Sequence, residues 1–396
     1  MGSFGGSRSA HLLSIVGTRP EAIKIAPIAL AAKGRSHLRH RILATGQHDA
    51  LFDDALAGFD LMPDQRLGPL LRDADPDIMV DRLAAAIDPM LHAAPPDLVL
   101  VQGDTNSALA GAIAARRAGI PVAHVEAGLR SFDLNHPWPE ERNRVLIDHI
   151  ATLLFAPTEQ AAANLRADGD VNGVIHVTGN TGIDALLLTR ARIQPPSSAS
   201  FGQPSLILLT CHRRENIGAG LERICEAVLR LAARGDVIIL CPVHPNPAVR
   251  VIIRARLGGH PAIRLLGALP YRDTVAAMAA ARLILTDSGG IQEEAPALGI
   301  PTLVLRDVTE RPEALATGNL ALVGTDPEQI VATASSLLDD PIAHAAMARP
   351  AFPFGGGDAA EKILDGVEQY FSSDPSGEHP LPFPPVWTKD GGPKGA

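Results

Sequence analysis

Short apolar runs alternate with longer segments of helical periodicity along most of this chain. In the first half, apolar runs typical of buried strands occur at 12–16, 41–45, 97–102, 121–125, 153–157 and 174–178. Segments with apolar residues at helical spacing lie between them, for example at 77–91, 107–118 and 140–150. Strands that alternate with helices are typical of βαβ units, whose parallel sheet is buried on both faces. The pattern therefore predicts an α/β fold.

The alternation is interrupted once and then resumes. Residues 193–204 read IQPPSSASFGQP, a Pro-, Ser- and Gly-rich stretch that indicates a linker. Strand-like runs follow at 205–210, 236–242, 262–267, 282–287, 301–305 and 320–324. We therefore expect two doubly wound Rossmann-like domains with a central cleft at the carboxyl ends of their strands. The expected parts are a flexible leader (1–10), an N-terminal domain (11–192), the linker, a C-terminal nucleotide-binding domain (205–356), a C-terminal helix packing back on the first domain (357–371) and a disordered tail (372–396).

Composition excludes several classes of protein. The formal net charge is −9 and no cluster of Lys and Arg occurs, which argues against a nucleic-acid partner. No apolar run approaches the ~18 residues of a membrane helix, and the N-terminus lacks the apolar core of a secretory signal. Cys211, Cys225 and Cys241 have neither disulfide-framework nor zinc-site spacing. The sequence thus predicts a cytoplasmic protein without membrane contact.

The first strand runs into a turn that could bind an anion. Gly17 follows the strand, Pro20 suits a first helical turn, and Arg19 and Lys24 carry positive charge nearby. A glycine turn before a helix presents free N–H groups to a phosphate, and Arg can bind a diphosphate with two hydrogen bonds. A plain turn with solvated charges explains the same residues equally well.

Three acidic residues follow strand-like runs or begin a helix in the first half. Asp104 comes after 97–102, Glu126 after 121–125, and Glu140 begins the segment 140–150. Taken alone, Asp104 is best explained as a helix N-cap and Glu140 as a first-turn charge. Carboxylates at strand ends also line ligand sites in such sheets. Arg144, four residues after Glu140, could hold it by an i,i+4 pair.

The second half places polar residues at strand ends as well. His212 and His244 each follow a strand-like run, although a lone histidine is more often structural. The run 282–287 leads into Ser288, Gly289 and Gly290, whose amides could approach a phosphate at a helix N-terminus. Glu293 and Glu294 follow in that helix, and Arg311 lies on a later loop. The stretch matches neither the Walker A nor the GxGxxG pattern, which disfavours ATP and dinucleotides.

Taken together, these segments resemble the non-hydrolysing UDP-N-acetylglucosamine 2-epimerases, a bacterial family with the GT-B-type fold. The resemblance runs from about Ile15 to Phe371 and rests on GTRPEAIKIAP, TGQH, GDT, HVEAGLR, PWPEERNR, TGNTGIDAL, HRREN, PVHPNP, TDSGGIQEEAP and RDVTERPEA. It implies catalytic roles for Asp104, Glu126, Glu140 and His212. It also implies a homodimer that uses no cofactor and no metal. The substrate-binding residues that we expect are Arg19, Lys24, Arg144, Tyr271, Ser288, Gly289, Gly290, Glu294 and Arg311.

Two segments depart from the family pattern. The family often carries a glutamine-bearing loop that helps to hold a second, regulatory UDP-sugar, whereas here 66–80 read RLGPLLRDADPDIMV. The regulatory contacts that the resemblance retains are Gln47, Arg213 and His244. Near Leu269 and Tyr271, the segment GALPYRDTV lacks side chains that elsewhere in the family approach the uracil.

The resemblance implies reversible C2 epimerisation of UDP-N-acetylglucosamine (UDP-GlcNAc) to UDP-N-acetylmannosamine (UDP-ManNAc). The C2 proton has no adjacent carbonyl, so elimination of UDP to 2-acetamidoglucal and its re-addition is the expected route. Proton removal and delivery on opposite faces require more than one acid/base group, which the carboxylates and the histidine would supply. Three alternatives stay open: a hydrolysing epimerase that releases ManNAc and UDP, a GT-B glycosyltransferase with a UDP-sugar donor, and a catalytically silent UDP-sugar sensor.

Overall fold

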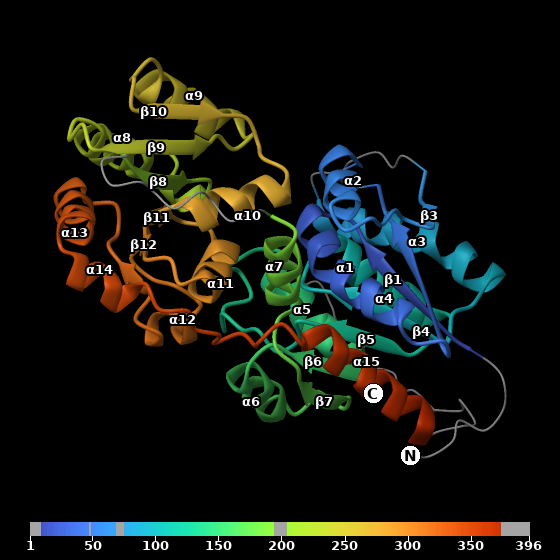
Figure 1. Cartoon of the computed structure of the whole chain (residues 1–396). Helices are drawn as coiled ribbons and strands as arrows, with labels where there is room; N and C mark the ends of the chain where they lie inside the picture. The colour runs from blue at the N-terminus through green and yellow to red at the C-terminus, as the bar shows by residue number, and fades with distance from the viewer. Residues whose placement is uncertain (1–8, 47–48, 69–74, 194–203, 374–396) are drawn as a thin grey trace. The chain divides into compact units, whose positions relative to one another are not determined.

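The computed structural model describes residues 9–46, 49–68, 75–193 and 204–373 and divides into two compact units. Unit 1 comprises residues 1–184 and 357–396, and unit 2 comprises 185–356. Most of the expected leader, linker and tail, and the regulatory candidate Gln47, lie outside the described residues. Figure 1 shows the elements of both units.

Unit 1 is built on a seven-stranded parallel sheet in the order β3-β2-β1-β4-β5-β6-β7. The strand order reverses between β1 and β4, and ligands of doubly wound sheets bind at the carboxyl ends of the strands at such a point. Its elements are β1 (Ala10–Val16), α1 (Arg19–Lys33), β2 (Leu38–Ala44), α2 (Asp49–Ala57), β3 (Gln65–Arg66), α3 (Pro76–Ala93), β4 (Leu98–Gln102), α4 (Asn106–Arg117), β5 (Val122–Val125), α5 (Glu140–Ile150), β6 (Leu153–Ala156), α6 (Glu159–Ala167), β7 (Val174–Val177) and α15 (Ala359–Ser373).

Unit 2 repeats this plan with a six-stranded parallel sheet in the order β10-β9-β8-β11-β12-β13. Its strand order reverses between β8 and β11. Helix α7 (Thr181–Ala191) spans the boundary between the units, and the remaining elements are β8 (Ser205–Thr210), η1 (Arg214–Asn216), α8 (Ala219–Ala232), β9 (Val237–Pro242), α9 (Pro247–Leu257), β10 (Ile263–Leu266), α10 (Tyr271–Ala280), β11 (Leu283–Thr286), α11 (Gly289–Leu298), β12 (Thr302–Val304), α12 (Pro312–Ala316), β13 (Leu320–Leu322), α13 (Pro327–Asp339) and α14 (Pro341–Met347).

The predicted α/β class, with two doubly wound parallel sheets, is confirmed. The central strands β4 and β11 are buried at every position, as expected of strands covered by helices on both faces. Small side chains let α4 lie close to the sheet, and eight of its residues are buried. Each unit has its own apolar core, with Ile15 and Leu83 in unit 1 and Leu209 and Val228 in unit 2.

The C-terminal helix α15 belongs to unit 1 and is drawn in red in Figure 1. Its first turn is capped by Asp184, whose carboxylate accepts hydrogen bonds from Ala359 N (3.3 Å) and Ala360 N (2.8 Å). Further along, Arg35 binds Glu368 through Nη1 at 2.7 Å. The chain re-enters unit 1 after the 172 residues of unit 2. Unit 1 is therefore built from two segments that are far apart in the sequence.

Candidate active site

The turn after β1 packs directly against the turn after β4. Gly17 leaves no room for a side chain, because a Cβ there would lie 2.0 Å from Ser107 Oγ and 2.4 Å from Thr45 Oγ1. The next residues begin α1, which starts at Arg19 with Pro20 in its first turn, as predicted. Close approach of the backbone at Gly17 therefore joins the start of α1 to the start of α4.

Glu21 joins these two turns and was missed as a site residue. Its side chain is buried and accepts hydrogen bonds from Gly17 N (3.1 Å) and Thr105 Oγ1 (2.8 Å). Burial raises the pKa of Glu21 to about 7, although the hydrogen bonds from Thr18, Thr105 and Gly17 oppose this. In the sequence, Glu21 resembles an ordinary first-turn carboxylate, and only its burial distinguishes it.

Raising the pH is expected to destabilise the fold through Glu21. The folded state retains a proton up to a pKa of about 7, whereas the unfolded chain releases it near 4.5. The stabilisation is complete below pH 4.5, declines above it and is lost above pH 7, a change of about 3 kcal/mol. Urea unfolding at pH 5 and pH 8 should show a larger loss of stability for the wild type than for E21Q. Equal losses would contradict the burial effect.

Asp104 follows β4 and is not the cap of the next helix. The cap of α4 is Thr105, whose hydroxyl accepts from Ala108 N at 3.1 Å, so the N-cap interpretation of Asp104 was wrong. The Asp104 carboxylate instead pairs with Arg144, and its backbone oxygen accepts from Asn143 Nδ2 at 3.0 Å. The Asp104 carboxylate is therefore not used to cap α4 and can contact a substrate or a proton-transfer partner.

Glu126 follows β5 in a strained backbone conformation. Its φ is 72°, a value that costs a non-glycine residue roughly 1–3 kcal/mol and is concentrated at functional sites. Glu126 Oε2 pairs with Lys24 and accepts from Gln102 Nε2 at 3.1 Å and Asn180 Nδ2 at 3.4 Å. Lys24 thus contacts a carboxylate of the cluster. Gln102 and Asn180 were not predicted, because their side chains are uncharged and reach Glu126 only in the folded chain.

Glu140 begins α5, and Arg144 does not pair with it. Arg144 binds Asp104 and lies 3.3 Å from Glu141 Oε2, so the expected i,i+4 pair is replaced by a tertiary contact. Burial alone would lower the pKa of Arg144, but Asp104, Glu141 and Glu126 outweigh it and raise the pKa. Glu140 Oε2 is buried and has no hydrogen-bond partner within the described part of the chain. A buried carboxylate oxygen without a partner is typical of a site that a ligand completes.

Unit 2 places His212 above a buried carboxylate. Asp287 is fully buried and accepts from the backbone N–H of His212 (3.0 Å) and Arg213 (3.0 Å) and from Asn216 Nδ2 (3.0 Å). His212 Nδ1 lies 3.4 Å from Asp287 Oδ1, and the His212 ring stacks on His244 at 5.2 Å. Burial lowers the pKa of His212, against the opposing effect of Asp287. The ring is therefore mostly neutral at pH 7 and could give or take a proton.

The predicted anion-binding segment at Ser288, Gly289 and Gly290 forms the N-terminus of α11. Ser288 is its N-cap residue but makes no side-chain capping bond, so the first amides of the helix are not satisfied by the cap. The Arg311 guanidinium lies over this turn, because a Cβ on Gly289 would be 2.7 Å from Arg311 Cζ. Arg311 Nε donates to Glu293 Oε1 at 2.7 Å, which fixes the guanidinium in place. Helix amides beside a guanidinium suit a diphosphate.

Two further predicted binding residues contact each other in unit 2. Tyr271 is 7% exposed, and its hydroxyl donates to Glu294 Oε1 at 2.9 Å. Glu294 lies one turn into α11, so the tyrosine orients this carboxylate beside the helix N-terminus. Of the regulatory candidates, His244 contacts His212, and Arg213 reaches Asp287 through its backbone N–H.

One group of described residues has the donor types of a metal site. His149, Asp168 and Asp170 place one ligand atom each within 4.8 Å of one another. Asp168 Oδ2 already contacts His149 Nε2 at 3.0 Å and lies 3.5 Å from Arg130 Nη2. Asp168 is thus already held by a hydrogen bond to His149 and by the Arg130 guanidinium, and we assign no metal to the group.

The comparisons with known proteins identify the family. A profile of UDP-N-acetylglucosamine 2-epimerase matches residues 30–368. The UDP-N-acetylglucosamine 2-epimerase of Escherichia coli K12 is 42% identical over 368 residues, which are 90% of this chain and 98% of that protein. The chain belongs to the UDP-N-acetylglucosamine 2-epimerase family. The UDP-N-acetylglucosamine 2-epimerase of Bacillus subtilis is 41% identical over 360 residues, 90% of this chain and 95% of that protein.

Solved structures of UDP-N-acetylglucosamine 2-epimerases match the fold. The enzyme from Neisseria meningitidis, bound to UDP-GlcNAc, has a TM-score of 0.83 at 37% identity and covers 91% of this chain and 100% of its own. The S. aureus MnaA–UDP co-structure also has a TM-score of 0.83 at 37% identity, covering 95% and 100%. The spinosyn rhamnosyltransferase SpnG, at 17% identity and a TM-score of 0.55 over 91% and 100%, shares the fold alone. The solved structures thus support the same family as the sequence comparisons and match the expected GT-B-type fold.

Two remaining features concern the cysteines and the length of the helices. Cys211, Cys225 and Cys241 are buried, unpaired thiols, and burial raises the pKa of Cys225 and of Cys241 to about 12. These thiols are therefore unreactive at neutral pH. None of the helices in the described ranges has the length and apolar character needed to cross a membrane.

Proposed function

We propose that this chain interconverts UDP-GlcNAc and UDP-ManNAc without releasing the sugar. The proposal rests on the family and on relatives solved with UDP-GlcNAc or UDP. The observation that carries the chemistry is the carboxylate set of unit 1. Asp104 and Glu126 each pair with a cation, and Glu140 has a buried oxygen without a partner among the residues described. Several acid/base groups are what a two-faced proton transfer requires.

In the first step, a carboxylate takes the C2 proton while the C1–O bond breaks. The electron pair of the C2–H bond forms the C1=C2 bond of 2-acetamidoglucal, and the C1–O pair leaves with UDP. We assign the role of base to Asp104 or Glu126, each of which follows a strand of the unit 1 sheet and pairs with a cation. Arg311 and the first amides of α11 are suited to the diphosphate, and each such donor contributes roughly 3 kcal/mol to stabilising a developing anion.

In the second step, the reaction runs in reverse on the other face of C2. A protonated carboxyl group donates to C2, and a UDP oxygen attacks C1, which restores the nucleotide sugar with inverted configuration. We assign Asp104, Glu126 and Glu140 to proton transfer, without dividing the faces between them. His212, neutral at pH 7 and backed by Asp287, is assigned to the leaving phosphate or to proton transfer beside it.

The remaining substrate contacts follow from the resemblance and the local geometry. We assign the diphosphate to Arg19, Ser288, Gly289, Gly290 and Arg311, and the ribose to Glu294, held by Tyr271. We assign Lys24 and Arg144 to the sugar end of the substrate, where Lys24 pairs with Glu126 and Arg144 pairs with Asp104. Gln47, Arg213 and His244 stay predicted regulatory contacts, and a cytoplasmic homodimer stays the expected state.

Proton NMR of the reaction with UDP-GlcNAc in D2O, without an acceptor, tests the proposal. We expect UDP-ManNAc to form and deuterium to enter C2 of both nucleotide sugars. Free ManNAc with UDP would identify a hydrolysing epimerase, and no epimer with at most slow hydrolysis would indicate a glycosyltransferase. Epimerised product without deuterium at C2 would contradict the elimination mechanism.

A further inference from the structure

A buried histidine lies behind the carboxylate set of unit 1. His124 is the third residue of β5, and its side chain is fully buried. Its Nδ1 lies 2.6 Å from Asp148 Oδ1, and its Nε2 lies 2.8 Å from the backbone oxygen of Gly103. Neither residue belongs to the proposed proton-transfer set or to the substrate contacts. Their burial and short contacts call for a separate role.

The hydrogen-bond partners fix the orientation of this histidine ring. A carbonyl oxygen can only accept, so Nε2 of His124 carries a hydrogen and donates to Gly103. Asp148 Oδ1 faces Nδ1 of the ring, and Asp148 Oδ2 accepts from Arg130 Nη1 at 2.6 Å and from Gly128 N at 3.2 Å. Both ring nitrogens of His124 and both carboxylate oxygens of Asp148 are therefore held by named partners. Arg130 Nη2 also lies 3.5 Å from Asp168 Oδ2.

The hydrogen bonds of His124 and Asp148 connect the three segments that carry the acidic residues. Gly103, which His124 binds, precedes Asp104 in the turn after β4. Gly128, which Asp148 binds, follows Glu126 by two residues in the turn after β5. Asp148 itself lies on α5, the helix that begins with Glu140.

We infer that the bridge from Asp148 through His124 to the Gly103 carbonyl is a positioning device that sets Asp104, Glu126 and Glu140 relative to one another. Its bond to Gly103, the residue before Asp104, carries most of the effect on the rate. The inference rests on the proposed function of these carboxylates. Glu126 needs such support, because its φ of 72° is unfavourable and persists only when the surrounding contacts over-determine it. Asp104 is held from both sides, since His124 binds the preceding carbonyl and Asn143 binds its own. A displacement of about 1 Å at a reacting group costs about 100-fold in rate.

Two substitutions of His124 separate positioning from stability. An asparagine amide can replace Nδ1, so H124N keeps the bond to Asp148 and loses the bond to Gly103. A glutamine amide can replace Nε2, so H124Q keeps the bond to Gly103 and loses the bond to Asp148. We expect kcat to fall about 100-fold in H124N, with KM for UDP-GlcNAc nearly unchanged, and clearly less in H124Q. Unfolding stability should follow the opposite order, because only H124N keeps the charge-assisted bond.

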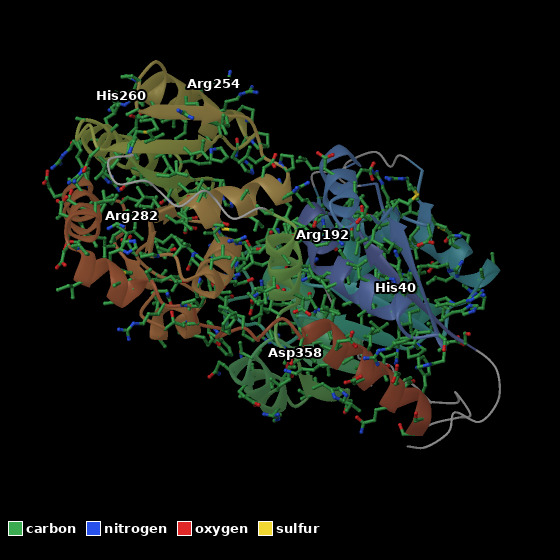
Figure 2. All side chains as sticks on the ribbon, viewed as in Figure 1. His40, Arg192, Arg254, His260, Arg282 and Asp358 are labelled. Carbon is green, nitrogen blue, oxygen red and sulfur yellow. The ribbon has the colours of Figure 1, made fainter. Side chains whose placement is uncertain are left out.

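The control is H40N, at a histidine of β2 that is labelled in Figure 2 and hydrogen-bonded to Ser14 Oγ at 2.8 Å. It should keep the wild-type kcat. If kcat of the His124 variants followed their unfolding stability, or if H124N kept full activity, the positioning role would be refuted.

If H124N fails to fold, the variant D148N tests the positioning role instead. An asparagine at position 148 can donate to Nδ1 of His124, which leaves the Nε2–H of His124 bound to Gly103. Its kcat should stay within about tenfold of wild type, and a 100-fold loss would refute the role.

A measurement independent of turnover tests the His124–Asp148 hydrogen bond itself. The Nδ1–H proton in a short bond to a carboxylate should give a far-downfield, exchange-protected proton resonance in the wild type. It should persist in catalytically impaired D104N and disappear in H124N and D148N. If the wild type shows this resonance but no deuterium at C2, the proposed function fails while the His124–Asp148 hydrogen bond stands. If the resonance is absent from the wild type, the bond from Nδ1 to Asp148 is wrong, and the bridge with it.

Discussion

Replacing Asp104 by asparagine is expected to reduce epimerisation by about 10²- to 10⁴-fold, the range for loss of a general acid or base. The amide keeps the shape of the side chain and can still accept from Arg144, with which Asp104 pairs. It cannot take a proton from C2. The rate of deuterium entry at C2 of UDP-GlcNAc measures the loss directly, because it reports proton removal even before net epimerisation.

UDP affinity of D104N should stay within a few-fold of wild type, because the groups assigned to the diphosphate are mostly in unit 2. Replacement of the exposed Asp170 by asparagine is the matched control and should leave turnover unchanged. Full activity of D104N would show that Asp104 is not part of the proton-transfer set. A large loss of UDP affinity would assign it to binding instead.

Displacing the Arg311 guanidinium is expected to weaken UDP binding without removing any charge. In G289A, the new Cβ would lie 2.7 Å from Arg311 Cζ, so the side chain must move from the N-terminus of α11. A bond to a charged group contributes about 1.5–3 kcal/mol, so UDP should bind about 10- to 100-fold more weakly. Isothermal titration calorimetry with UDP gives the dissociation constant.

R311A should weaken UDP binding at least as much as G289A, but it also leaves Glu293 without its guanidinium partner and should destabilise unit 2. G289A is therefore the cleaner variant. The matched control is R254A, at an exposed arginine of α9 that is labelled in Figure 2. It removes a positive charge from the same unit and should leave the dissociation constant unchanged. Wild-type affinity in both G289A and R311A would refute the diphosphate assignment.

Most strands could be located from the sequence because buried strands consist of short runs of apolar residues. The run at 153–157 became β6 (Leu153–Ala156), and 205–210 became β8 with unchanged bounds. The strand β3 (Gln65–Arg66) was not predicted, because it has two exposed polar residues and no apolar signal. Pairing with the neighbouring β2 is what makes this segment a strand.

Rules for helix capping and for i,i+4 charge pairs were less reliable at the candidate active site. The cap of α4 could be Asp104 or Thr105 by residue type, and only the backbone conformation selects Thr105. Arg144 was expected to pair with Glu140 along the helix, but it binds Asp104 from another segment. In both cases a tertiary contact of a charged group replaced a local one, and rules based on sequence spacing describe only the local contacts.

The sequence alone determined the α/β class, the two-fold repetition of the sheet plan and the motif set that indicates the family, because apolar periodicity and turn residues are local properties. Only the tertiary structure revealed that Glu21 is buried between two turns, that Lys24 contacts Glu126, and that His124 and Asp148 connect the three acidic segments. Protonation and pairing depend on desolvation and on neighbours far away in the chain. These properties exist only once the strands have been brought together.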